Sequence, residues 1–147
     1  MRRVIHLRFF LHEAKWVPVF AGTTEFEDMR DAANAVIVVV ALLHLYFMVL
    51  EMFLWTGPLG RRAFGLTAEF AEASKRLAAN QGLYNGFLAA GLLWGVWLGD
   101  AGFAVKLFFL ICVLIAGVFG ALTVSRKILW FQAVPAAIAI VLLHFPY

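Results

Sequence analysis

Long apolar stretches separated by short polar connections form the main pattern along the chain. A helix needs about 20 mostly apolar residues to cross the roughly 30 Å hydrocarbon core of a membrane. Four stretches reach or nearly reach that length, and they cover residues 32–55, 77–98, 102–124 and 128–145. Because backbone N–H and C=O groups in lipid must pair within their own segment, each stretch is predicted to be a helix.

The composition strengthens this interpretation. Of the 147 residues, 64% are hydrophobic and only 14% are charged, and the mean hydropathy is +0.90. An average soluble domain has roughly 25% charged residues. We therefore predict an all-α fold: a polytopic membrane protein whose residues 29–147 form one bundle of four transmembrane helices.

Local signals define the connections between these helices. The segment TGPLGRRAFGL after the first helix carries Gly and Pro punctuation and two arginines, which is typical of a turn-rich polar loop. Thr67 is placed to cap the second helix, which should begin outside the membrane near Ala68 and enter it near Leu77. Pro135 lies about two turns into the fourth helix and should disturb it there.

The distribution of lysine and arginine predicts the orientation in the membrane. The first and third connections are basic, whereas the second has no lysine or arginine. The basic residues are Arg61, Arg62, Lys75, Arg76, Arg126 and Lys127. By the positive-inside rule both basic connections face the cytoplasm, so both termini lie outside it. Lys106, one turn into the third helix, should extend its ammonium group to the outer surface.

Residues 1–28 do not continue this pattern. They carry Arg2, Arg3, Arg8 and Lys15, which oppose an outside N-terminus, and they lack the sustained apolar run of a signal peptide. Their segment WVPVFAGTTE resembles the product of a bacterial intergenic repeat translated by mistake. We therefore predict a non-native, disordered extension from a mis-annotated start. The alternative is a genuine cytoplasmic or surface amphipathic segment.

Ionisable and amide side chains inside the apolar stretches are the candidate functional residues. A charged group at mid-membrane costs about 2.5–3.5 kcal/mol on insertion scales, so such residues face protein or a water-filled cavity. His44 and Glu51 are seven residues apart and lie on one face of the first helix. Amide and phenol side chains at similar depth on the second and fourth helices should complete a polar pocket in the cytoplasmic half. They are Asn80, Gln81, Tyr84, Asn85 and Gln132.

Two interpretations of this pocket stay open. Polar residues between membrane helices often serve only as hydrogen-bond glue, worth about 0.6 kcal/mol on average. A glutamine at position 51 would supply such hydrogen bonds without an ionisation penalty, so we assign substrate binding or proton relay to Glu51. For His44 alone and for the amides, glue and ligand contact remain as alternatives.

Other kinds of site are not indicated. The sequence has no nucleophile elbow, no phosphate-binding glycine loop and no Cys/His metal cluster. His44 and Glu51 are about 10 Å apart along the helix, which is too far to hold one ion. We expect no metal, no cofactor and no nucleic-acid partner, and we assign no catalytic residue.

Small residues form two ladders on the second helix, rotated from each other. They are Gly82, Gly86 and Ala90 on one face and Gly91, Gly95 and Gly99 on the other. Such ladders let helix backbones approach closely. We therefore expect the second helix to be central, with neighbours on both sides, and one of its faces could serve a partner copy.

Three contiguous motifs resemble a known family. The segments ALLHLYFMVLEMFLW, GRRAFG and LAANQGLYNGFLAAGL are similar to those of domain of unknown function family 1304, small four-helix bacterial membrane proteins. The resemblance runs from about Arg30 to the C-terminus. It implies the four-helix architecture and an inner-membrane address, and it implies no activity.

Three functional classes follow from these features. The first is a small-molecule, proton-coupled transporter or permease-like protein, in which Glu51 and His44 handle the proton. One four-helix chain has little room for a pathway, so this class requires a homo-oligomer. The second is a membrane-embedded enzyme or a lipophile- or quinone-binding protein, and the third is an accessory membrane subunit. We favour the first, with the lipid bilayer and a small molecule as partners, and we do not expect an enzyme.

Overall fold

The computed structural model describes residues 19–145, with side chains from residue 27 onward. This part of the chain contains five α-helices and no strands, which confirms the all-α prediction. The helices are α1 (Val19–Phe53), α2 (Pro58–Phe64), α3 (Ala68–Trp97), α4 (Phe103–Thr123) and α5 (Val134–His144). A 3₁₀ turn (Gly99–Gly102) joins α3 to α4, and a π-helical turn (Leu129–Ala133) leads into α5.

The non-native origin of residues 1–28 stays a prediction. Residues 1–18 lie outside the described residues. Helix α1 already begins at Val19, well before residue 32, where the apolar stretch was predicted to start.

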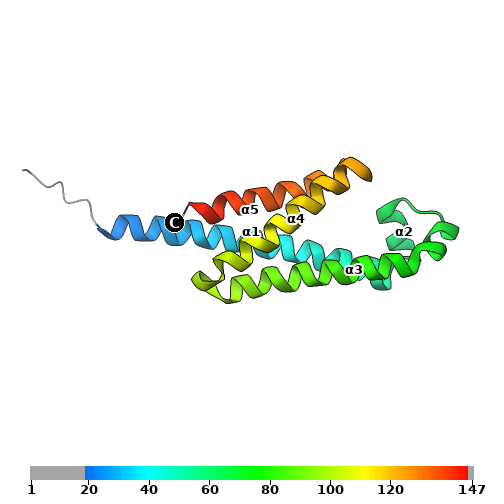
Figure 1. The fold of residues 1–147 in the computed structure, drawn as a ribbon, viewed down its shortest axis with the longest axis horizontal. Coiled ribbons are helices and arrows are strands. Elements are labelled where there is room, and N and C mark those ends of the chain that lie inside the picture. Colours follow the sequence, from blue (N-terminus) through cyan, green and yellow to red (C-terminus); the bar gives the residue numbers. More distant parts are fainter. Residues whose placement is uncertain (1–18, 146–147) are drawn as a thin grey trace, which may run out of the picture.

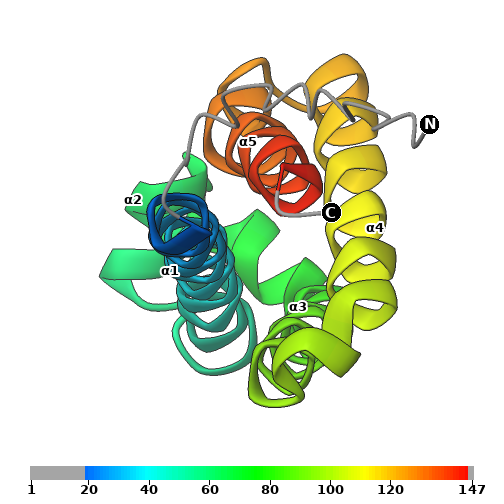
Figure 2. The ribbon, with the colours of Figure 1, turned by 90° about the vertical axis from the view of Figure 1, so that its left-hand side faces the viewer.

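Helices α1, α3, α4 and α5 pack side by side in chain order and alternate in direction (Figure 1). Viewed end-on they form a ring in which α1 contacts α3 and α5, and α4 contacts the same two helices (Figure 2). Helix α2 and the connection between α4 and α5 lie at one end of the bundle, and the 3₁₀ turn lies at the other (Figure 1). We call these the α2 end and the 3₁₀ end.

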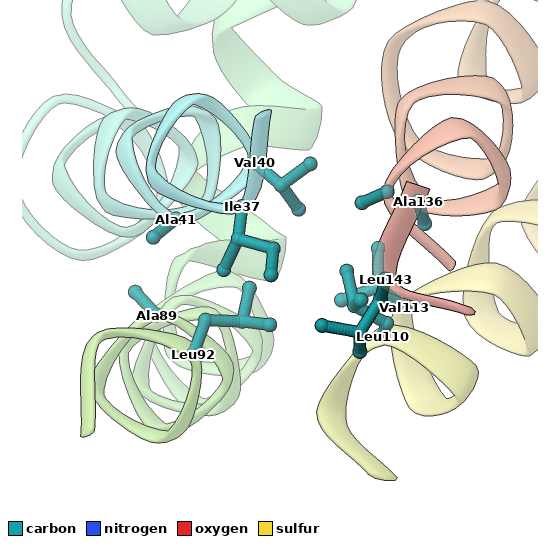
Figure 3. Packing of buried hydrophobic residues seen from close by; sticks show 10 residues of the cluster. Ile37, Val40, Ala41, Ala89, Leu92, Leu110, Val113, Ala136 and Leu143 are labelled. Atoms are coloured by element: carbon teal, nitrogen blue, oxygen red, sulfur yellow. The ribbon is translucent and has the colours of Figure 1, made fainter. Parts of the chain in front are cut away.

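Aliphatic side chains from all four of these helices fill the centre of the bundle (Figure 3). The members of this core are Ile37, Val40, Ala41, Ala89, Leu92, Leu110, Val113, Ala136, Ala139 and Leu143. Each is at most 1% exposed. The fully buried core residues of α1 are residues 37–41, and they lie on the 3₁₀ side of His44.

Large apolar side chains also cover the outside of the bundle. Two helical stretches in the described part, Glu27–Phe53 and Gly99–Thr123, are long and apolar enough to cross a membrane by length and composition, with mean hydropathies of 2.4 and 2.6. Only 28% and 22% of their most apolar windows are buried inside the chain, whereas the core helix of a soluble protein is mostly buried. A shorter apolar helical stretch covers Leu129–His144. Two apolar helices capable of spanning are thus present, and the four-span arrangement stays a prediction.

The segment predicted as a polar loop after the first helix contains α2, so that prediction is wrong. Pro58 occupies the first turn of α2. A backbone N–H at this position would have no partner within the helix, so its absence in proline costs no hydrogen bond. Gly65 adopts a φ of 67° and ends the helix, with the cap N–H bonded to the Arg61 carbonyl. Here the Gly and Pro residues are helix caps rather than loop residues.

The predicted start of the second long helix is confirmed. Helix α3 begins at Ala68, and the Thr67 hydroxyl accepts a hydrogen bond from the Phe70 N–H at 3.2 Å. Hydrogen bonds from its own backbone N–H and from the Thr67 hydroxyl hold the pKa of the Glu69 carboxyl below its ordinary value. The first turn of α3 is therefore capped and carries a negative charge, which suits the positive end of a helix dipole.

Helix α3 is central, as its small residues predicted. A Cβ at Gly82 would lie 3.1 Å from the Met48 carbonyl oxygen of α1, and a Cβ at Gly91 would lie 2.2 Å from the Phe109 ring of α4. Both small faces therefore pack against neighbouring helices inside the chain, at Gly82 and at Gly91, and their use by a partner copy stays a prediction.

Lys106 does not extend to the surface, so that expectation is wrong. Its side chain is 1% exposed, and its ammonium group donates to Asn34 Oδ1 at 3.3 Å and to the Gly99 carbonyl at 3.1 Å. Gly95 makes room for this inward path, since a Cβ there would lie 2.6 Å from Lys106 Cγ. The contacts tie α1 to the 3₁₀ end of the bundle.

Candidate functional site

Glu51 meets Asn85 where α1 packs against α3. Asn85 Nδ2 donates to Glu51 Oε2 at 2.7 Å, and both side chains are partly buried. The close approach depends on Gly82, one turn before Asn85, because a Cβ there would lie 3.1 Å from Glu51 Cβ. A carboxyl group in the apolar face of α1 is thus matched by an amide donor on the neighbouring helix.

His44 meets Gln132 two turns before Glu51 on α1. The ring is 1% exposed, and its Nδ1 lies 2.8 Å from the Val40 carbonyl, to which it donates. In a neutral ring with that tautomer Nε2 is an acceptor, and Gln132 Nε2 donates to it at 3.4 Å. Both ring nitrogens therefore have partners.

A π-helical turn sets the position of Gln132. Pro135 has no N–H for the carbonyl four residues before it, and its ring would clash with that carbonyl in a regular helix. The chain widens into the π turn Leu129–Ala133 and resumes as α5 with Pro135 in its first turn. Turns of this type are rare overall, and a large share of them occur at functional sites. The expected disturbance at Pro135 is therefore this turn, and it carries an amide that faces the buried histidine.

Met48 separates the two polar pairs. It lies one turn from each of His44 and Glu51, which are about 10 Å apart along the axis of α1. Its sulfur packs over Gly86, where a Cβ would come within 2.9 Å of it. The Glu51–Asn85 and His44–Gln132 pairs are therefore two separate contacts, divided by one flexible thioether side chain.

Three residues predicted for the pocket do not reach it. Asn80, Gln81 and Tyr84 are all exposed on the outward side of α3. Each residue turns a helix by about 100°, so Asn80 and Asn85 point roughly 140° apart. Once the small face with Gly82 is turned to α1, Asn85 can reach Glu51 and the other three cannot.

The sequence analysis missed a second polar cluster at the 3₁₀ end. Arg30 Nη1 pairs with Asp100 Oδ1 at 2.9 Å, and Asn34 accepts from Lys106. A signal for it exists, because Arg30 and Asn34 continue the inward stripe of α1 at spacings of three and four residues. That stripe consists of residues 30, 34, 37, 41, 44, 48 and 51. Helix α1 therefore presents polar groups at both ends of its inward face and apolar groups between them.

Comparison with known proteins gives a family and one curated relative. The family model described as Protein of unknown function (DUF1304) matches residues 38–144. Uncharacterized protein YpaA of Lactococcus lactis subsp. lactis (strain IL1403) is 32% identical over 104 residues, which cover 69% of this chain and 87% of the relative. No solved structure matches the chain. The region that the family model matches includes both polar pairs.

Proposed function

Because the chain belongs to the DUF1304 family of proteins of unknown function, we propose a function from its own residues: proton-coupled movement of a small molecule across the bacterial inner membrane. In this proposal α1, α3, α4 and the π turn with α5 span the membrane. Both termini lie outside, and the protein works as a homo-oligomer.

The outward surface of the bundle supports the membrane placement. Large apolar side chains remain exposed on α1 between Val39 and Phe53 and on α4 between Phe108 and Leu122, among them Leu42, Phe108, Ile115 and Phe119 at 55–66%. Monomeric soluble proteins rarely expose contiguous apolar patches larger than a few hundred Å². The two basic connections also lie at one end of the bundle, the α2 end, which supports a common cytoplasmic side (Figure 1).

One observation carries the functional part: the Glu51 carboxyl group lies inside an apolar helix and accepts a hydrogen bond from Asn85 at 2.7 Å. Ionisable residues in spanning helices are costly, and they mark substrate and proton pathways. A carboxyl group can take up a proton and pass it on, which an amide in the same place cannot do.

The arrangement suggests an order of events. Glu51 is nearer the α2 end, so it would receive the proton or the substrate from the cytoplasmic side. His44 lies deeper and can accept a proton at Nε2 once Gln132 turns away. Met48 is flexible, and its movement would let water or substrate connect the two pairs. The apolar core beyond His44 keeps the other half closed in this conformation.

The proposal is tested on protein purified gently with its native lipid. We would compare the wild type with Glu51→Gln by mass spectrometry and absorbance, with Glu72→Gln on the exposed first turns of α3 as the matched control. The expected result is a bound small polar molecule that is lost from Glu51→Gln alone. A quinone or isoprenoid lost in the same way would instead support a lipophile-binding protein or membrane enzyme.

Proton coupling is tested separately by infrared difference spectroscopy after a pH step. The wild type and Glu72→Gln should show a carboxyl C=O signal that Glu51→Gln lacks. If all three proteins give the same spectrum, Glu51 exchanges no proton and coupling through it is ruled out. Unchanged spectra together with no specific ligand would favour an accessory subunit in which the polar pairs only stabilise the bundle.

A further inference from the structure

The outward face of α3 carries a regular row of exposed side chains. Its members are spaced alternately by three and four residues, which is the heptad spacing of helices that pair along a seam. We name this row the α3 seam, and it consists of Phe70, Ala73, Leu77, Asn80, Tyr84 and Phe87. All six residues are exposed, with Phe70, Leu77, Tyr84 and Phe87 at 58%, 76%, 50% and 57%. The seam stops at Gly91, the next position in the row, because that position packs against α4.

The seam is independent of the contacts inside the bundle. Ala71, Ala78, Gly82 and Ala89 are buried on the opposite side of α3, which faces α1 and α4. A regular helical surface of about 18 residues, or roughly 26 Å, is therefore left without a partner in one chain.

We propose that the α3 seam is the contact surface for a second copy of this chain, with the two α3 helices parallel. This proposal rests on the membrane placement proposed above. In a symmetric pair of copies inserted in the same orientation, the twofold axis runs along the membrane normal, so each seam residue faces its own counterpart. Asn80 would then meet Asn80 of the other copy.

Asn80 suits such a position. An amide both donates and accepts, so two asparagines can bond to each other across a twofold axis, as two like charges could not. Asn80 lies about one turn past Leu77, where α3 is predicted to enter the membrane, and the lipid tails beyond that point offer an amide no partner. A single asparagine in an otherwise apolar seam is also a known way to fix the register of paired helices.

The residues that flank the seam fit a parallel pair. In a parallel pair, the residue just before Leu77 or Tyr84 on one helix faces the residue five places later in the sequence on the other helix. This brings Arg76 to Gln81, which are both exposed, and it brings no like charges together. Lipid tails would not cover the whole row, because Phe70 lies in the turns of α3 that precede the membrane-spanning part.

A cysteine scan tests the seam in native membranes. With Cys112 replaced by serine, single cysteines would be placed at residues 77, 79, 80, 84 and 87 and oxidised, and disulfide-linked dimer measured on non-reducing gels. The matched control is Phe119→Cys, which lies about one turn from the end of α4 at similar depth and is 66% exposed. Dimer should form at 77, 80, 84 and 87 and fall to the control level at 79. Equal yields at seam and control positions would overturn the proposal.

Asn80 is tested by energy transfer between labelled copies in lipid vesicles. Asn80→Leu should weaken self-association by about 3- to 10-fold, the range expected for loss of an interhelical hydrogen bond, whereas Asn80→Gln should restore it. Unchanged association in Asn80→Leu would contradict the role given to the amide.

Alkaline carbonate extraction of the same membranes separates the two proposals. Protein that is extracted contradicts the membrane placement itself. Protein that stays in the membrane but shows no seam cross-links contradicts only the contact surface.

Discussion

Gly82 matters to the candidate site although it has no side chain. A Cβ at this position would lie 2.6 Å from Met52 Cγ and 3.1 Å from both Glu51 Cβ and the Met48 carbonyl. The α1 backbone cannot move away from such a contact without loosening the packing that brings Asn85 to Glu51. The geometry of the Glu51–Asn85 pair therefore depends on the lack of a side chain at position 82.

We predict that Gly82→Ala lowers the free energy of unfolding by about 1–3 kcal/mol, the usual cost of overpacking. The control is Gly86→Ala, whose Cβ would meet only the end of the flexible Met48 side chain, at 2.9 Å from its sulfur. Thermal unfolding in one lipid or detergent system would measure both. Equal losses for the two variants would show that the contact with the α1 backbone is not limiting.

Asn85→Leu removes the only hydrogen-bond donor that the described structure gives to the Glu51 carboxyl group. We expect a loss of about 1–3 kcal/mol in the free energy of unfolding, the cost of leaving a buried polar group unsatisfied. Glu51→Leu combined with Asn85→Leu should recover much of it, because both polar partners are then gone. A double-mutant cycle measures this coupling, and additive losses would mean that the pair contributes nothing as a pair.

At this scale the sequence could identify the right residue types but only some of the contacts. Helical depth placed Glu51 at the level of Asn85 and Gln132, with His44 deeper in the membrane. The structure brings Asn85 to Glu51, whereas Gln132 reaches His44 instead. Depth alone could not determine the rotation of α3, which depends on which side of that helix packs best. Asn80 therefore faces outward.

At the scale of the elements, the π turn crosses α4 at very close range. A Cβ at Gly117 would lie 2.7 Å from the Ala133 backbone nitrogen, the last residue of the turn. A Cβ at Gly120, one turn later, would meet only the Ile128 side chain, at 3.1 Å or more. Gly117 and Gly120 lie on one face of α4. Gly117 therefore faces backbone atoms, whereas Gly120 faces a side chain that can move.

Gly117→Ala should therefore destabilise the protein by about 1–3 kcal/mol, since backbone must shift. Gly120→Ala should cost less, because alanine also favours the helical state by up to about 1 kcal/mol over glycine. Chemical denaturation in mixed micelles would compare them. A larger loss for Gly120→Ala would contradict the crossing geometry.

Hydropathy predicted the long helices well, because a sustained apolar run is the strongest signal a helix can give. It failed for α2, where Gly57, Pro58 and Gly65 read equally well as loop punctuation and as helix caps. It also could not show whether Pro135 would bend the helix or widen it, since either change relieves the clash of the proline ring with the preceding turn.

At the scale of the whole molecule, α1 organises the bundle. Its inward stripe bonds to the 3₁₀ end through Asn34, then contributes Ile37 and Ala41 to the core, and then carries His44 and Glu51 toward the α2 end. Polar contacts therefore lie on both sides of an apolar plug. In the proposed transporter that plug separates the two faces of the membrane, and access to the polar pairs comes from the α2 end.

This arrangement makes orientation the decisive test at the molecular scale. Arg62 in α2 and Ser125 after α4 are both exposed at the α2 end, whereas Ala101 is exposed in the 3₁₀ turn. With Cys112 replaced by serine, we predict that Ala101→Cys reacts with a membrane-impermeant maleimide on intact cells. Arg62→Cys and Ser125→Cys should react only after permeabilisation, because the basic residues around them hold the α2 end in the cytoplasm. The opposite labelling pattern would place the α2 end outside the cytoplasm, and the proton or substrate would then enter from the outer side. Labelling at all three positions in intact cells would contradict the four-span placement, because no orientation of an alternating bundle exposes both ends on one side.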